Sequence, residues 1–135
     1  MTVIGSLWEF GWNTPIKEFD LWHYPMREFG VDEIAMTPVS GIKNKVREFH
    51  SVEEMIQYYG LPVILCDELG ETPLQRFEHP KEGALYLFGR TSRSLLGQYN
   101  YPSIKIETPE EKGMLWGHQA ASIIMYDRFC KWQLQ

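Results

Sequence analysis

Unbroken runs of apolar residues, bounded by polar residues, glycine or proline, recur along the chain. The runs at 61–66 and 84–88 are typical of strands inside a parallel sheet, because such strands are buried on both faces. Shorter β-rich runs predict three more strands. The five predicted strands comprise residues 2–10, 34–37, 61–66, 84–88 and 103–106.

Two helices are predicted between these strands from their capping sequences. Residues 13–30 begin with a polar cap and a proline at the first helical position, and a glycine ends the segment. Pro25 lies inside this segment and should kink or divide the helix. Residues 51–54 form a capping box, which predicts a short helix that ends at Gly60.

The last helix is predicted in the segment that begins at Lys112 and continues past Arg128. Its apolar side chains would cover most of the helical circumference, and they are Leu115, Ala120, Ile123, Ile124, Met125, Tyr126 and Phe129. A helix that is apolar on several sides must be buried on several sides. We therefore expect it to pack against the sheet of its own chain and against a second subunit.

The alternation of strands and helices predicts a single α/β domain over residues 1–135, with a mostly parallel sheet. In such sheets, ligands bind beyond the carboxyl ends of the strands. Asp67, Gly89 and Glu107 follow three of these ends. We therefore expect three loops to converge on the last helix and to form a binding site there.

The composition suits one domain with its own core, since 44% of the 135 residues are hydrophobic. The net charge of −5 argues against broad electrostatic attraction to nucleic acid, so any RNA contact needs a local basic patch. The densest positive run, at 43–47, is either a solvated loop or a phosphate contact. Cys66 and Cys130 are expected to be reduced thiols, because two distant cysteines indicate neither a metal site nor a disulfide.

Targeting signals are not recognised in the sequence. The first residues lack the basic start of a signal peptide, and no apolar run approaches the length of a membrane span. A cytoplasmic location is therefore expected, with neither membrane nor DNA as a partner.

Common catalytic and cofactor motifs are also missing from the sequence. It has no Walker loop, no glycine-rich dinucleotide fingerprint and no nucleophile elbow. The four histidines are scattered and none is four residues from another, so no metal site is expected. Residues 89–94 combine glycine, hydroxyl groups and two arginines. They could wrap an anion or form an ordinary surface loop.

Three sequence motifs, taken in order, resemble the SPOUT superfamily, and more narrowly the SpoU/TrmH-type RNA 2′-O-ribose methyltransferases. They are FGVDEIAMTP at 29–38, ALYLFGRTSRSL at 84–95, and IKI at 104–106 with AASIIMYD at 120–127. Each motif alone is weak, but their order and spacing are together specific. The resemblance covers nearly the whole chain.

The resemblance implies an α/β fold with a trefoil knot at its C-terminal end, S-adenosylmethionine bound in the knot, and tRNA or rRNA as substrate. It also implies a homodimer that pairs through the first and last helices. The residues that match the three cofactor loops are Leu65 and Cys66, then Phe88, Gly89 and Arg90, and lastly Ile106, Met114 and Leu115. In the family these contacts are largely apolar or made by the backbone, so the substitutions here are compatible with binding.

The polar residues that make the family catalytic are replaced at the matched positions. The arginine that activates the ribose hydroxyl falls on Tyr24, and the asparagine of the same helix falls on Glu18. The glutamate and glycine of the second motif fall on Thr91 and Ser94. The asparagine that opens the last helix falls on Trp116 or a neighbour. The resemblance thus implies the fold of the family, but this sequence lacks the family's usual catalytic side chains.

Three hypotheses follow from this combination. An active RNA methyltransferase would use other side chains: Arg27, Arg90 and Arg93 for phosphate, His23 and His118 as candidate bases, and Lys43 and Lys45 for RNA. The alternative is a catalytically inactive scaffold that docks on RNA or on another protein. A third hypothesis is a protein that consumes the cofactor or sequesters a nucleotide in the knot pocket.

Two of the aromatic residues also have purely structural interpretations. His118 is expected one turn into the last helix, where it could be a packing or interface histidine instead of a base. Trp116 could form a wall or a dimer contact instead of a stacking platform. The sequence leaves both alternatives open.

Overall fold

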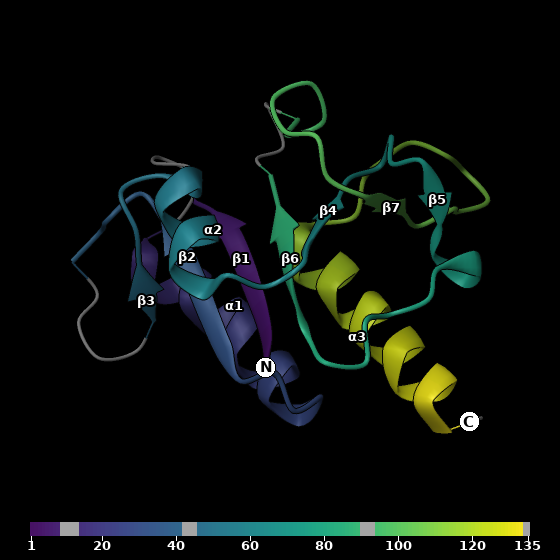
Figure 1. Cartoon of the computed structure of the whole chain (residues 1–135), viewed down its shortest axis with the longest axis horizontal. Coiled ribbons are helices and arrows are strands. Elements are labelled where there is room, and N and C mark those ends of the chain that lie inside the picture. Colours follow the sequence, from purple (N-terminus) through teal and green to yellow (C-terminus); the bar gives the residue numbers. More distant parts are fainter. Residues whose placement is uncertain (9–13, 42–45, 90–93, 134–135) are drawn as a thin grey trace.

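A computed structural model of the chain describes residues 1–8, 14–41, 46–89 and 94–133 (Figure 1). Within them, the strands are β1 (Thr2–Leu7), β2 (Glu33–Thr37), β3 (Arg47–Glu48), β4 (Val63–Cys66), β5 (Thr72–Pro73), β6 (Ala84–Phe88) and β7 (Ser103–Lys105). The helices are α1 (Pro15–Glu28), α2 (Val52–Tyr59) and α3 (Gly117–Gln133), with a single 3-10 turn η1 (Leu74–Arg76).

The strands form one sheet in the order β3-β2-β1-β6-β4-β7-β5, and each pair of neighbours is parallel. The predicted mostly parallel α/β sheet is thereby confirmed. β7 lies between β4 and β5, although β5 is the next strand after β4 along the chain. The last strand is therefore inserted between two segments that precede it.

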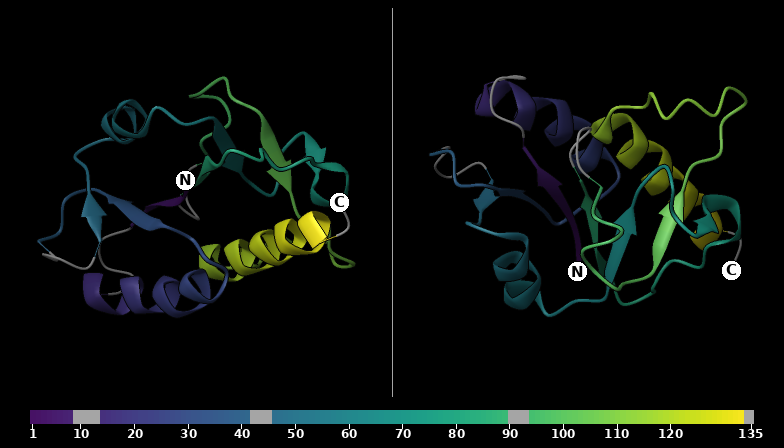
Figure 2. Two further views of the ribbon diagram at one scale, coloured as in Figure 1. Left: turned by 60° about the horizontal axis from the view of Figure 1, so that its bottom comes forward. Right: turned by 90° about the horizontal axis from the view of Figure 1, so that it is seen from above.

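Helices α1 and α3 cover one face of the sheet, and α2 covers the other (Figure 2). Successive side chains of a strand point to opposite faces. In β6, Tyr86 and Phe88 belong to the core beneath α1 and α3, whereas Leu85 and Leu87 belong to the core beneath α2. All four are buried, which explains why this strand is an unbroken apolar run in the sequence.

Both predicted helix caps form. Thr14 Oγ1 accepts a hydrogen bond from Lys17 N at 3.3 Å at the start of α1. Ser51 Oγ accepts one from Glu54 N at 3.1 Å at the start of α2. Gly60 then ends α2 in the left-handed conformation, with a φ of 59°.

Several boundaries differ from the predictions. α1 continues through Pro25 as one helix, because Trp22 and Met26, on either side of the proline, are both buried against the sheet. β1 ends at Leu7, and residues 9–10 of the predicted strand lie outside the described residues. β3 and β5 are missing from the prediction because a strand of two residues leaves no periodicity to detect.

Only one face of α3 is buried within the chain. Its buried residues are Ala121, Ile124 and Met125, whereas Ile123, Tyr126 and Phe129 are exposed. Within the single chain the helix is therefore buried only against its own sheet, and the burial of its other face by a second subunit stays a prediction. The helices of the described residues are too short or too polar to cross a membrane.

Candidate functional site

The turn that follows β4 is fixed against β7 by backbone hydrogen bonds. Asp67 N donates to Ile104 O at 3.1 Å, and Gly70 N donates to Asp67 O at 3.0 Å. Asp67 Oδ1 also accepts from Leu69 N at 2.9 Å, which closes the turn. A Cβ atom at Gly70 would lie 2.4 Å from Ile104 O, so only glycine lets the turn approach β7 this closely.

The segment before α3 reaches the same turn. Gly113 has a φ of +61°, and a Cβ atom there would lie 1.4 Å from Glu68 Oε2. The Glu68 carboxylate therefore lies directly against the backbone of Gly113. Two of the three segments that were predicted to converge are thus in contact at the carboxyl edge of the sheet.

Three of the residues matched to cofactor loops are core residues. The side chains of Leu65, Cys66 and Phe88 are buried in the two cores, so only their backbone can face a ligand. Burial raises the pKa of the Cys66 thiol, and the charge of Asp67 adds to this shift. The thiol therefore stays protonated and packs as an apolar side chain.

The other matched residues are more accessible. Met114 is 78% exposed and Leu115 is also exposed, whereas Ile106 is partly buried against the core beneath α1 and α3. Gly89 follows the last residue of β6 directly. Arg90 lies outside the described residues. The exposed apolar pair that precedes α3 is the part of the predicted site that a ligand could cover.

Trp22 connects α1 to the end of β6 and to the start of α3. Its ring makes an edge contact with that of Phe88, with 5.4 Å between centroids. A Cβ atom at Gly117 would lie 2.9 Å from the indole, so the first residue of α3 rests on it. Trp22 Nε1 donates to Glu18 Oε1 at 3.0 Å. Glu18, β6 and α3 therefore meet around one buried indole.

His118 is the second residue of α3, not one turn into the helix as predicted. The centroid of its ring lies 6.4 Å from that of Trp22 and 5.5 Å from that of Trp116. Burial lowers the pKa of His118, and the Glu18 carboxylate partly opposes this shift. The imidazole is therefore neutral at pH 7 and can accept a proton.

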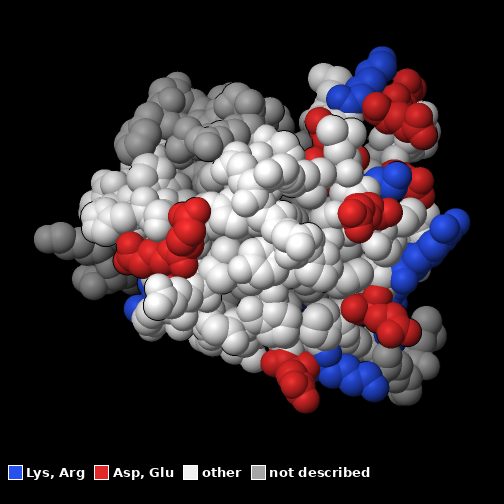
Figure 3. Space-filling view, turned by 45° about the horizontal axis from the view of Figure 1, so that its top comes forward, with Lys and Arg blue, Asp and Glu red and all other residues white. Residues whose placement is uncertain are grey.

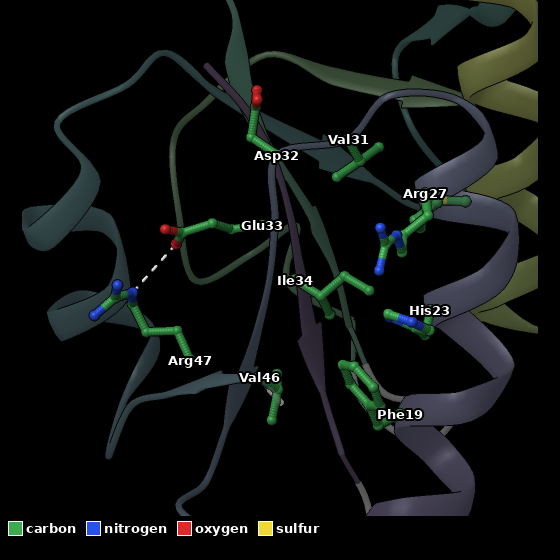
Figure 4. A pocket seen from close by; sticks show the side chains of 10 residues that line it. Phe19, His23, Arg27, Val31, Asp32, Glu33, Ile34, Val46 and Arg47 are labelled. Carbon is green, nitrogen blue, oxygen red and sulfur yellow. Dashed lines mark hydrogen bonds and ion pairs between the residues drawn. The ribbon is translucent and has the colours of Figure 1, made fainter. Parts of the chain in front are cut away.

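His23 and Arg27 line a separate groove of about 750 Å³ between α1 and the strands β2 and β3 (Figure 4). Phe19 contacts the His23 ring at 4.8 Å between centroids, and Arg47 pairs with Glu33 at 3.1 Å on the opposite wall. Because α1 runs antiparallel to the strands, Arg27 lies near the amino end of β2. These two predicted catalytic residues are therefore separated from His118 and from the predicted cofactor residues.

The predicted RNA contacts Lys43, Lys45, Arg90 and Arg93 lie outside the described residues. Figure 3 brings the carboxyl edge of the sheet forward and shows a broad area without charged side chains across its middle. The Lys and Arg side chains drawn in that view lie towards its margins. Across the described residues, no group of three or more His, Cys, Asp or Glu side chains is placed to hold a metal ion.

Two carboxylates at this edge have no role in the sequence prediction. Glu68 lies in a polar loop without a motif, so nothing in the sequence marks its approach to Gly113. Glu18 enters the sequence analysis only as a departure from the family pattern. Its position one helical turn before Trp22 is a usable signal, because residues four apart on a helix are neighbours.

No protein-family model matches the chain, and no curated protein matches it. Solved structures do match. A structure described as giving structural insights into the 2-OH methylation of C/U34 on tRNA has a TM-score of 0.75 and 17% identity, covering 99% of this chain and 98% of the other.

Two longer proteins also share the fold. The SpoU methyltransferase AviRb from Streptomyces viridochromogenes, in complex with AdoMet, has a TM-score of 0.72 and 14% identity, covering 98% of this chain and 58% of AviRb. An RNA 2′-O ribose methyltransferase has a TM-score of 0.74 and 12% identity, with coverages of 98% and 57%. The chain therefore has the fold of the SpoU-type RNA methyltransferases, and the resemblance inferred from the sequence is confirmed at the level of the fold.

Proposed function

We propose that this chain binds S-adenosylmethionine at the carboxyl edge of β4, β6 and β7 and methylates ribose 2′-hydroxyl groups of RNA. The observation that carries the proposal is the contact of Glu68 with Gly113, which joins the turn after β4 to the segment before α3. Ligands of parallel α/β sheets bind at this edge. The shared fold with RNA methyltransferases, one of them in complex with AdoMet, supports the choice of ligand.

The chemistry of the described residues fits such a ligand. Leu69 and Met114 are exposed apolar side chains that can cover an adenine ring. The Glu68 carboxylate beside them can accept hydrogen bonds from ribose hydroxyls. When bound, S-adenosylmethionine supplies a methyl group on a positively charged sulfur.

His118 is the residue that we expect to accept the proton of the RNA hydroxyl. Its neutral imidazole lies at the start of α3, and Trp22 connects it to the end of β6. Loss of the proton makes the ribose oxygen a stronger nucleophile, and a positioned base contributes about 10²–10⁴-fold to such a reaction. His23 and Arg27 would contact RNA outside the reacting centre.

The trefoil knot implied by the resemblance is part of the proposal. Its support is the insertion of β7 between β4 and β5, because the last strand takes a place in the sheet between two segments that precede it along the chain. A knot would hold the turn after β4 and the segment before α3 together without requiring a large apolar contact between them.

A homodimer is also part of the proposal. Ile123, Tyr126 and Phe129 form an exposed apolar face on α3, and the rings of Tyr126 and Phe129 are stacked at 6.3 Å. On α1, Ile16 and Tyr24 are exposed as well. Contiguous exposed apolar surface of this kind marks interaction sites in soluble proteins. We propose that these faces of α1 and α3 pair between two copies of the chain.

Methyl transfer from tritiated S-adenosylmethionine to total RNA tests the function. The expected result is incorporation that appears in 2′-O-methylated nucleosides after digestion. Met114→Glu should lower incorporation at least about tenfold, because it places a charge on the apolar adenine surface. Tyr58→Glu is the matched control, since Tyr58 is exposed on α2 at the opposite face of the sheet. Wild-type protein without incorporation would contradict the enzyme proposal.

The second candidate function is a catalytically inactive scaffold that binds the same ligand or RNA. Two observations favour it. Tyr24 is 72% exposed and Trp116 is also exposed, at positions where the resembling enzymes carry polar catalytic residues. Binding of S-adenosylmethionine without methyl transfer to any RNA fraction would select this alternative.

A further inference from the structure

Glu18 carries a buried carboxylate oxygen without a partner. The residue is only 9% exposed. One oxygen, Oε1, accepts the hydrogen bond from Trp22 Nε1, whereas Oε2 is inaccessible to solvent and has no hydrogen-bond partner among the described residues. Buried carboxylates are normally paired, because an unpaired charge in an apolar environment is unfavourable. Glu18 Oε2 therefore needs a partner that the described residues do not supply.

The charge around Glu18 indicates what that partner should be. Within the described residues, neither a lysine nor an arginine forms an ion pair with Glu18. The charge of Glu18 acts on His118, whose pKa burial lowers, so that the imidazole is neutral at pH 7. Its hydrogen-bond partner Trp22 belongs to the apolar core and packs against Phe88. A neutral donor would satisfy the oxygen, but only a cation would also balance the charge.

Glu18 lies near the carboxyl edge of the sheet, where we propose that the cofactor binds. Glu18 lies in the first turn of α1, next to the carboxyl end of β1, and its partner Trp22 contacts both the last residue of β6 and the first residue of α3. RNA ribose and phosphate groups offer no cation. An S-adenosylmethionine molecule offers two, the sulfonium and the α-ammonium.

We propose that Glu18 is the anionic subsite for the cationic part of an adenosyl-sulfonium ligand. The inference rests on the proposed function, because it assumes a ligand at the carboxyl edge of the sheet. Oε2 is covered in this conformation. The ligand must therefore displace part of its cover, and His118 and Trp116, which are only partly covered themselves, are the side chains that we expect to move.

Calorimetric titration of wild-type protein and Glu18→Gln with three ligands tests the inference. Glutamine keeps the shape and an oxygen for Trp22 Nε1 but removes the charge. We expect Glu18→Gln to bind S-adenosylmethionine about tenfold more weakly and 5′-methylthioadenosine, which has neither cation, equally well. S-adenosylhomocysteine keeps only the ammonium. If Glu18→Gln also binds this ligand more weakly, Glu18 pairs with the ammonium. If its affinity for this ligand is unchanged, Glu18 pairs with the sulfonium.

Two further variants keep the test interpretable. Asp20→Asn removes a charge from an exposed position of the same helix and should change no affinity. Glu18→Asp keeps the charge on a shorter side chain and should lose less affinity for S-adenosylmethionine than Glu18→Gln. It also replaces Glu18→Gln if that variant does not fold.

Three results would overturn the inference without affecting the proposed function. If Glu18→Gln loses the same affinity for all three ligands, Glu18 has only a structural role in α1. If its affinities are unchanged, Glu18 does not contribute to ligand binding. A larger loss in Glu18→Asp than in Glu18→Gln would contradict the role of charge. Wild-type protein that binds none of the three ligands would instead overturn the proposed function, and the subsite with it.

Discussion

His79 Nε2 lies 2.8 Å from Asp127 Oδ2, and the other ring nitrogen of His79 lies 2.6 Å from the Tyr86 hydroxyl. The neutral imidazole can donate to Asp127 and accept from Tyr86, so the three side chains connect β6 to α3 through the segment after η1. Lys131 Nζ adds contacts to Asp127 at 2.8 Å and to Leu74 O at 2.6 Å. This network fixes the C-terminal half of α3 to the sheet.

Replacement of His79 by alanine should destabilise the protein. It leaves the buried Tyr86 hydroxyl without its partner, which costs about 1–3 kcal/mol, whereas Asp127 keeps its ion pair with Lys131. We expect urea denaturation to show a decrease of this size in the free energy of unfolding of His79→Ala. His50→Ala, at an exposed position, is the control and should change little. Equal stability of the two variants would contradict the role of the network.

Stability should also depend on pH through the same histidine. Burial lowers the pKa of His79 below its ordinary value of 6.5, and the hydrogen bond and charge of Asp127 oppose the shift without cancelling it. Below pH 6.5 the unfolded chain therefore binds more protons at this site than the folded chain, so stability falls as the pH falls.

The measurement is the free energy of unfolding between pH 7.5 and pH 5. Wild-type stability should decrease over this range, and His79→Gln should show a smaller decrease. His118, whose pKa is also lowered by burial, contributes with the same sign, so some dependence should remain in the variant. A wild-type stability that rises on acidification would contradict this account.

Gly113→Ala should weaken ligand binding at the proposed site. The added Cβ is disfavoured by the positive φ of this residue, by about 1 kcal/mol, and it would collide with the Glu68 carboxylate. Gly60→Ala is a matched control, because Gly60 has a similar φ of +59° but open space around its Cβ position.

Both glycine variants should lose some stability, whereas only Gly113→Ala should lose affinity for S-adenosylmethionine. The double variant Gly113→Ala with Glu68→Ala removes the collision and should recover stability relative to Gly113→Ala alone. Equal affinities for S-adenosylmethionine in the two single variants would show that the segment before α3 does not contribute to the site.

The exposed face of α3 provides the test of the dimer. Tyr126→Glu and Phe129→Glu place charges on the proposed interface and should shift the protein towards monomer at micromolar concentration, measured by light scattering. Tyr58→Glu on α2 should leave the oligomeric state unchanged. A wild-type protein that is already a monomer under these conditions would exclude the proposed interface.

Much of the fold is accessible from the sequence because its signals are local. The apolar runs of β4 and β6 reflect burial on both faces, and the caps at Thr14 and Ser51 depend only on residues three positions apart. The signals that determine where α3 begins are not local. Residues before Gly117 have helix-compatible side chains, but the contact of Gly117 with Trp22 and of Gly113 with Glu68 decides where the helix begins.

The site was only partly predictable for the same reason. The order of strands places the turn after β4 and the segment before α3 at one edge, and the structure brings them together. The contact between Glu68 and Gly113 joins distant parts of the chain, so no spacing rule detects it. His23 and Arg27 are visibly neighbours on a helix. Their location in a separate groove depends on how the buried side of α1, with Trp22, packs against the sheet.

Isothermal titration of the wild-type protein with S-adenosylmethionine tests the central claim most directly. We expect saturable binding with a dissociation constant between about 1 μM and 1 mM, the range common for enzyme substrates. Binding should weaken in Gly113→Ala and Met114→Glu and stay unchanged in Tyr58→Glu. Absence of binding to folded wild-type protein at a ligand concentration of about 5 mM, several times the upper end of that range, would contradict the assignment of the site.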